Sequence, residues 1–366
     1  MRILQVVVRF FPFVGGVENT VYHLGRRLKA RGHEVRVVCA DEPAGSLPEI
    51  EGIPVIRLPW RFKIGNTNLC FGLWEALRAE KADVIHAHLP TALFIDMAAV
   101  VADVSGTPLV LTYNNDLVGE GMKGVLADVY NRHRLPKVFA ACSRIVITNP
   151  LYPTQSPFLD PADPKLAYIP WGVDPGKFRF SEKFPDGPMT VGFLSLLDEH
   201  HRYKGLEVLF KALAELPDVR LRVGGAGKEL EWYRERARQL GVADRVEFLG
   251  FVENLNDFYA SCHVFALPST DGRREGFGLV LLEAMACGRP VITTPIVGVA
   301  SDIEPRGVGV LVPPDDPSAL AKGLRSFQDL PAMGRRGRQL VEERYSWNHV
   351  TDEYERLFES LIRANP

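Results

Sequence analysis

The sequence lacks an excess of positive charge, because 43 lysines and arginines are balanced by 45 aspartates and glutamates, for a formal net charge of −2. This balance argues against nucleic acid as the main partner, since the chain has no domain-wide basic excess to neutralise its phosphates. The five cysteines are scattered and never spaced as CxxC, so we expect free thiols in a reducing compartment. No apolar run reaches the length of a membrane-spanning helix, and we expect no signal peptide in the first residues. The cytoplasm is the expected location.

What the chain does contain is a regular alternation of β-branched runs and helical patterns, which predicts α/β domains on parallel, doubly wound sheets. One series starts with a buried strand at 3–8, and a second starts with a strand at 190–194. Between them lies a polar, proline-bearing stretch at 175–188. A length of 366 residues also favours two domains over one. We therefore predict two Rossmann-like domains that face each other across a cleft.

The most informative segment is 268–290, where Glu275 and Glu283 are joined by a Gly-Phe-Gly turn and an apolar helical run. Glycines at the start of a helix expose free backbone N–H groups at its positive end, a site suited to phosphate. Glu283 lies about two turns into this helix, where a carboxylate is costly unless it has partners. The alternative is a surface helix with charges in its first turns. We interpret the segment as a sugar-nucleotide site, with phosphates on the N–H groups and hydroxyls on the carboxylates.

A series of short motifs is specific in its order and spacing. These are GGVE at 15–18, DVIHAH at 83–88, IPWGVD at 169–174, YKG at 203–205, GGAGKE at 224–229, RVEFLGFV at 245–252, GVGVLVPPDD at 307–316 and YSW at 345–347. With them, the chain resembles the retaining glycosyltransferases of family four over nearly its full length. The resemblance implies the GT-B architecture, with an acceptor-side domain at 1–172 and a nucleotide-sugar-binding domain at 173–345. It also implies that the final helix, 346–366, returns to the first domain.

On the donor side, the resemblance assigns Glu283 to the ribose hydroxyls of the nucleotide. It assigns Glu275 to the donor sugar, where the carboxylate supports positive charge at the anomeric carbon. The turn between them would receive the diphosphate on its backbone N–H groups. This turn consists of Gly276, Phe277, Gly278 and Leu279.

Lys204 matches the family lysine that contacts the phosphates; the alternative is a solvated lysine at a helix N-terminus. The arginine that many relatives carry shortly before it is absent, and Arg202 is our candidate to replace it. Gly16, in the turn between the first strand and helix, is expected beside the diphosphate or the acceptor, although such glycines also serve turn geometry alone. Contacts to the nucleotide base are expected from the backbone near Val252.

On the acceptor side we predict contacts from His86, Asn114, Asn115 and Asp116. We expect one histidine of the HAH motif to be buried and hydrogen-bonded and the other to face the cleft. Asn114 stands where most relatives have a histidine. Because asparagine cannot change its charge near neutral pH, either the role is positional and Asn114 performs it, or the enzyme is impaired or differently specialised. We favour the positional role.

A basic cluster occupies 121–140. Its members are Lys123, Arg132, His133, Arg134 and Lys137. The simplest interpretation is a solvated helix face. The alternative is contact with an anionic acceptor or with the surface of a membrane.

The predicted function is a retaining, metal-independent transfer of a hexose from a nucleoside-diphosphate sugar to a saccharide or lipid-linked hydroxyl. Glu275, Lys204 and Asn114 are the predicted catalytic residues, with no metal and no cofactor beyond the donor. Two alternatives are a sugar-nucleotide epimerase or hydrolase on the same fold and a non-catalytic nucleotide-sugar-binding subunit. An epimerase would need further acid and base residues, and the presence of Glu275, Glu283 and Lys204 argues against a non-catalytic subunit.

Overall fold

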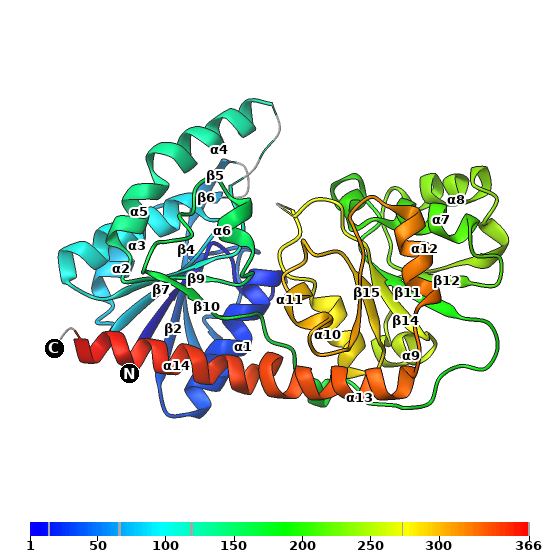
Figure 1. Ribbon diagram of the computed structural model, residues 1–366. Helices are drawn as coiled ribbons and strands as arrows, with labels where there is room; N and C mark the ends of the chain where they lie inside the picture. Colours follow the sequence, from blue (N-terminus) through cyan, green and yellow to red (C-terminus); the bar gives the residue numbers. More distant parts are fainter. Residues whose placement is uncertain (14, 65–66, 118, 120, 273, 365–366) are drawn as a thin grey trace. The chain divides into compact units, whose positions relative to one another are not determined.

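The computed structural model describes every residue except 14, 65–66, 118, 120, 273 and 365–366. The chain forms two compact units, each built on its own sheet (Figure 1). Unit 1 consists of Met1–Gly172 with Trp347–Pro366, and unit 2 of Val173–Ser346. In both sheets helices cover the two faces, which confirms the predicted α/β class with doubly wound parallel sheets.

The sheet of unit 1 has parallel neighbours throughout, except for one short antiparallel edge strand. Its order is β10 (Leu166–Tyr168), β9 (Arg144–Ile147), β8 (Leu109–Tyr113), β7 (Val84–His88), β1 (Arg2–Val6), β2 (Glu34–Ala40), β4 (Ile53–Leu58) and β3 (Glu49–Ile50). The central strands are buried along almost their whole length because both faces are covered. The strand order reverses between β1 and β7, which makes the carboxyl ends of these strands the switch point of the unit.

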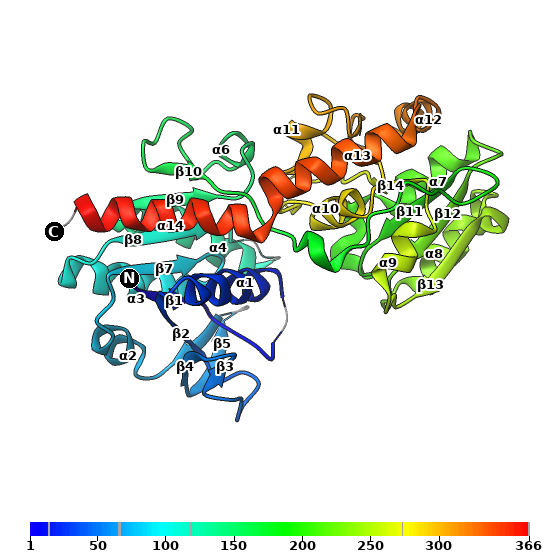
Figure 2. The ribbon, with the colours of Figure 1, turned by 90° about the horizontal axis from the view of Figure 1, so that it is seen from below.

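Two helical layers cover this sheet. On one face the core contains α2 (Leu73–Ala79), α3 (Ala92–Ser105) and α5 (Leu135–Ala141). On the other face lie α1 (Gly16–Ala30) and the last helix, α14 (Trp347–Ala364), seen side by side in Figure 2. The remaining elements are α4 (Met122–His133), α6 (Tyr152–Gln155) and an antiparallel hairpin of β5 (Trp60–Ile64) and β6 (Thr67–Cys70).

The apolar stripe of α14 is part of the core of unit 1. Trp347, Tyr354 and Phe358 pack with residues of α1 and the sheet, and each is at most 5% exposed. Arg31 forms an ion pair with Glu355, and His33 forms a hydrogen bond with the same carboxylate. The stripe is thus covered because the chain returns to unit 1 after the π-helical turn Val341–Tyr345.

The sheet of unit 2 is parallel throughout. Its order is β13 (Val246–Gly250), β12 (Arg220–Gly224), β11 (Thr190–Leu194), β14 (Val264–Leu267), β15 (Val291–Thr293) and β16 (Gly309–Leu311). Its helices are α7 (Leu206–Ala214), α8 (Leu230–Gln239), α9 (Leu255–Ala260), α10 (Leu279–Ala286), α11 (Ala300–Ile303), α12 (Pro317–Arg325) and α13 (Leu330–Leu340). Short 3₁₀ turns lie at Pro175–Lys177, Glu199–Lys204 and Ala243–Arg245. Here the order reverses between β11 and β14.

Candidate active site

The switch point of unit 2 brings together the two segments that carry the predicted donor residues. Ligands of open α/β sheets bind at the carboxyl ends of the strands where the order reverses. Lys204 ends the 3₁₀ turn that follows β11, and Glu275 lies in the loop that follows β14. Because β11 and β14 are hydrogen-bonded neighbours, the two loops leave the sheet side by side.

Lys204 and Glu275 form a buried ion pair. The Nζ atom of Lys204 lies 2.7 Å from Oε2 of Glu275, and the side chains are 17% and 2% exposed. Ser269 donates a second hydrogen bond of 2.7 Å to the same oxygen. Burial lowers the pKa of Lys204, but the charges of Glu275 and Tyr203 outweigh it and raise the pKa above its ordinary value. The side chain of Lys204 therefore stays protonated beside the carboxylate of Glu275.

Glycines allow the backbone to approach closely at two points of this site. Gly205 has φ +85°, and a Cβ atom there would overlap the carbonyl oxygen of Pro268. Gly278 has φ +86° and caps α10, and a Cβ atom there would lie 2.6 Å from Val297. Both positions need glycine for backbone conformation and for space. By contrast, nothing lies within 4 Å of a Cβ atom built on Gly276.

Glu283 lies on α10 and accepts a hydrogen bond from Tyr259. The hydroxyl of Tyr259 is 2.7 Å from Oε2, and the described part of the chain offers the carboxylate no cation. Burial raises the pKa of Glu283 to about 7, although the bond from Tyr259 lowers it. A ligand with hydroxyl donors would favour the ionised form. Phe277, at the start of the helix, is buried against the ring of Tyr345, which anchors the turn.

Two other predicted donor residues have different surroundings. Arg202 forms an ion pair with Glu229, and its guanidinium lies 4.3 Å from the ring of Trp232. Its contacts are thus with α8 and the residue before it. Val252 is half-buried and packs toward Gly224 at the end of β12.

At the switch point of unit 1, Trp171 joins two predicted site residues. A Cβ atom on Gly16, the first residue of α1, would lie 2.7 Å from the Trp171 ring. The indole Nε1 of Trp171 donates to Oδ1 of Asn114 at 3.1 Å. The Nδ2 atom of Asn114 donates to the carbonyl of Leu89 at 2.7 Å. Asn114 is therefore buried, and its side-chain amide both donates and accepts a hydrogen bond.

The prediction that His86 faces the acceptor is wrong. Both histidines of the HAH motif are fully buried, and they lie two residues apart on β7, so they point to the same face of the sheet. His86 bonds Thr112 at 2.7 Å and packs against Tyr354 and Phe358, while His88 bonds Gln5 at 3.0 Å. Burial lowers the pKa of His86 strongly and that of His88 to about 3. Both are neutral core histidines.

Asn115 and Asp116 lie in the loop after β8. Asp116 is 5% exposed and accepts hydrogen bonds from the hydroxyls of Tyr113 and Ser156, the latter at 2.7 Å. Asn115 is half-buried, and both residues line an apolar groove described below. The loop is therefore held in place by Asp116, while Asn115 remains accessible.

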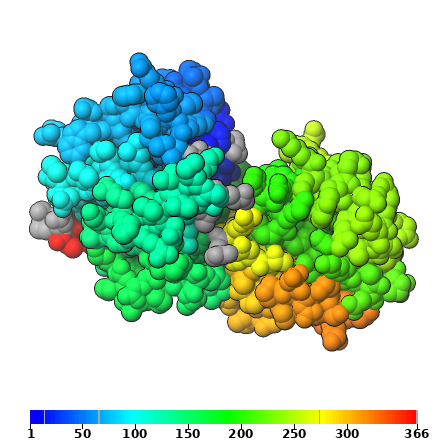
Figure 3. Space-filling view, turned by 90° about the horizontal axis from the view of Figure 1, so that it is seen from above, coloured from blue at the N-terminus to red at the C-terminus, as the bar shows by residue number. Residues whose placement is uncertain are grey.

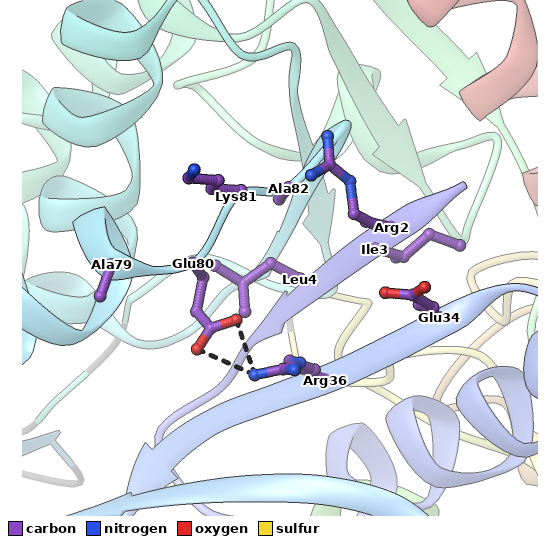
Figure 4. A pocket seen from close by; sticks show the side chains of 9 residues that line it. All are labelled: Arg2, Ile3, Leu4, Glu34, Arg36, Ala79, Glu80, Lys81 and Ala82. Carbon is purple, nitrogen blue, oxygen red and sulfur yellow. Dashed lines mark hydrogen bonds and ion pairs between the residues drawn. The ribbon is translucent and has the colours of Figure 1, made fainter.

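Three further features concern metals, membranes and other pockets. The described residues contain no group of three or more side chains suited to hold a metal. No helix among them is long and apolar enough to cross a membrane. A polar pocket lies at the amino ends of β1 and β2, where Arg36 pairs with Glu80 at 3.3 Å (Figure 4). This edge is opposite to the switch point, so the pocket does not belong to the site.

Comparison with protein families covers most of the chain. The model described as Glycosyltransferase Family 4 matches residues 14–176, and the model described as Glycosyl transferases group 1 matches residues 176–344. The chain belongs to this glycosyltransferase family. Both matches agree with the resemblance drawn from the motifs.

Full-length relatives of this glycosyltransferase include two enzymes of Mycobacterium tuberculosis. Phosphatidyl-myo-inositol mannosyltransferase is 29% identical, over 99% of this chain and 97% of the relative. Glycogen synthase is 28% identical, over 96% and 92%. Among solved structures, sucrose-phosphate synthase from Thermosynechococcus elongatus has a TM-score of 0.75 at 24% identity, over 99% of both chains. Anabaena HepE, solved in complex with UDP, has a TM-score of 0.75 at 22% identity, over 98% and 100%. These structural matches show the GT-B fold.

Three residues that contact the predicted site of the glycosyltransferase were missed from the sequence. They are Ser269, Tyr259 and Trp171, which bond Glu275, Glu283 and Asn114 respectively. Trp171 lies within the IPWGVD motif and Ser269 within the segment 268–290. Their positions in these motifs could have pointed to a role at the site. Tyr259 lies in a helix before β14 and carries no such signal.

Proposed function

We propose that the chain is a retaining, metal-independent hexosyltransferase that uses a nucleoside-diphosphate sugar. The observation that carries this proposal is the buried Lys204–Glu275 pair at the switch point of unit 2. Departure of a nucleoside diphosphate requires positive charge on its oxygens, and electrostatic help of this kind is usually the largest contribution to catalysis. Lys204 supplies a fixed cation there, which supports a reaction without a metal.

Glu275 is suited to stabilising charge rather than to attacking the sugar. Its Oε2 atom already accepts hydrogen bonds from Lys204 and Ser269. These bonds reduce its strength as a nucleophile and orient the second oxygen. No described side chain bonds this second oxygen, which leaves it for hydroxyls of the donor sugar.

The start of α10 is suited to the diphosphate and the ribose. The first N–H groups of a helix generally lack a partner within it and carry the positive end of the helix dipole. In α10 the N–H group of Leu281 already bonds the carbonyl of Gly278, so the N–H groups before it are the ones suited to a phosphate. Gly276 leaves open space beside this turn. Glu283, whose pKa is about 7, gains hydroxyl partners if the ribose binds next to Tyr259.

The acceptor is a saccharide or a lipid-linked hydroxyl. The names of the relatives cover both classes, since one acts on phosphatidyl-myo-inositol and another makes glycogen. Asn114, with both polar groups of its amide engaged, is suited to hold the loop after β8 and not to transfer protons.

The first test is a thermal-shift panel of UDP-, GDP- and ADP-sugars on the purified protein. A donor at a hundred times its Kd raises stability by about 2.7 kcal/mol. Product NMR from the donor that binds then reports the anomeric configuration and any acceptor-free hydrolysis or epimerisation. Absence of binding and of turnover for every donor would overturn the proposal.

A second test separates chemistry from binding. Glu275→Gln keeps the shape of the side chain but removes its charge, and we expect turnover to fall by about 10²–10³-fold. The control is Glu247→Gln, because Glu247 is an exposed carboxylate paired with an arginine on the neighbouring strand. Equal turnover of the two variants would contradict the role of Glu275.

A further inference from the structure

Unit 1 contains an apolar groove at the loop that carries Asn115 and Asp116. Its volume is about 520 Å³, within the range of pockets that enclose one small molecule. Ile64 and Leu69 of the β5–β6 hairpin form one wall, and Leu126 and Tyr130 of α4 form another. Leu93 of α3 and Leu117 of the loop after β8 complete the apolar lining.

Helix α4 carries an exposed apolar face beside the groove, and Leu126 belongs to both this face and the groove lining. Met122, Val125, Leu126 and Val129 are spaced as one helical face, yet they are 81%, 64%, 56% and 49% exposed. In a globular unit such a stripe is normally buried against the core. Here Asn131 is the residue of α4 that the structure buries, and the helix lies along the outside of unit 1, on the face seen in Figure 3.

The opposite wall repeats this pattern. Phe62 and Ile64 lie two residues apart on β5, and they are 65% and 60% exposed. Uncovered apolar residues therefore flank the groove on both sides. Exposed apolar residues on two elements beside a groove favour the binding of an apolar partner.

One positive charge at the groove is uncompensated. Lys123 lines the groove, and among the described residues it has no ion-pair partner. The neighbouring charges are paired, since Arg132 bonds Asp128 and Arg134 bonds Asp96. The groove lining also includes two carboxylates: Asp96 pairs with Arg134, and Asp116 accepts hydrogen bonds from Tyr113 and Ser156. Lys123 is thus the lining charge without such a partner among the described residues, and it complements an anionic group on an apolar chain.

Resting on the proposed transfer reaction, we propose that the acceptor is an amphiphile whose hydrocarbon chain occupies this groove. Its anionic head, a phosphate or similar group, pairs with Lys123. Asn115, accessible in the same groove, is placed to contact the polar end of the acceptor. The groove is a concave site with walls from four segments, so it fits one chain of a single molecule better than the plane of a bilayer.

The test uses dodecyl phosphate below its critical micelle concentration and the full-length protein without donor. Calorimetric titration should show saturable binding with one site, and inorganic phosphate should not bind measurably. We expect Leu126→Glu to weaken binding at least ten-fold, because it places a charge in the apolar wall. Lys123→Ala should weaken it roughly three- to ten-fold by removing the cation.

Two matched controls should bind like the wild type. Val104→Glu changes a 63%-exposed apolar residue of α3 outside the groove, and Lys137→Ala removes an exposed cation of α5. Thermal unfolding of each variant shows that it is folded. Equal binding by all variants, or no binding of dodecyl phosphate, would overturn the proposal.

The remaining outcomes separate this inference from its alternatives. If the protein floats with phosphatidylglycerol vesicles but does not bind dodecyl phosphate, the exposed apolar surface is a membrane-docking face and not a binding groove. This outcome would overturn the proposal. Binding of inorganic phosphate as tight as that of dodecyl phosphate would also overturn it. Groove binding without any donor binding would support the inference while the transferase function failed, so the two proposals can be distinguished.

Discussion

Replacement of Glu283 by glutamine should stabilise the protein at alkaline pH and leave its stability unchanged at acidic pH. Glu283 is held on α10 with Tyr259 as its hydrogen-bond donor, and burial raises its pKa from 4.5 to about 7. Below the unfolded pKa both states are protonated, so the carboxyl group costs nothing. Between pH 4.5 and 7 the folded state alone keeps the proton, so stability falls as pH rises.

The magnitude follows from this shift in pKa. A rise from 4.5 to about 7 corresponds to about 3 kcal/mol, lost in full above pH 7. Glutamine can accept the bond from Tyr259 without carrying charge, so the variant avoids this loss. For a unit of this size about 1 kcal/mol shifts the melting temperature by roughly 2–4 °C. The variant should therefore melt up to about 10 °C higher than the wild type at pH 8.

The assay is scanning calorimetry of the full chain at pH 5, 6, 7 and 8. Tyr259→Phe serves as a second arm, because loss of its hydroxyl removes the bond that lowers the Glu283 pKa and so enlarges the penalty at pH 8. In the wild type, nucleotide affinity should increase as the pH rises through 7, because ribose hydroxyls favour the ionised carboxylate. In Glu283→Gln, nucleotide affinity should not change over this pH range. A stability difference that is the same at pH 5 and pH 8 would refute the reasoning.

Three further predictions concern packing and the ion pair. Lys204→Met leaves the buried Glu275 without its cation and should cost about 3–5 kcal/mol in urea unfolding, with much of the loss recovered when Glu275→Leu is added. Gly205→Ala should lower the free energy of unfolding by more than roughly 2 kcal/mol, because Gly205 has φ +85° and lies against a backbone carbonyl. Gly187→Ala should lower it by about 1 kcal/mol, because Gly187 has φ +98° but lies in open space. Phe358→Ala should cost about 3–5 kcal/mol, because a fully buried ring between α14 and the sheet is lost; an unchanged unfolding midpoint would show that α14 is not held by its stripe.

Local patterns in the sequence were sufficient for much of the fold. Short apolar strands, helical stripes and glycine turns are decided by neighbours within a few residues, and the strand predicted at 190–194 has the bounds predicted for it. The β5–β6 hairpin was missed, because the mostly exposed residues of β5 do not follow the burial pattern of a strand in a parallel sheet. His86 was misplaced, since the alternation of side chains on β7 sends it toward the core with His88.

The chemistry of the candidate site could also be read from residue types, because a carboxylate inside an apolar helix and a lysine before a glycine stand out on their own. Which of them meet was decided by tertiary structure alone. Lys204 and Glu275 are 71 residues apart, and they pair because β11 and β14 are neighbours in the sheet. Tyr259 bonds Glu283, and Trp171 bonds Asn114, through contacts that also join residues far apart in the sequence. Strand order depends on how whole layers pack. The type of a residue therefore does not identify the distant residue that it contacts.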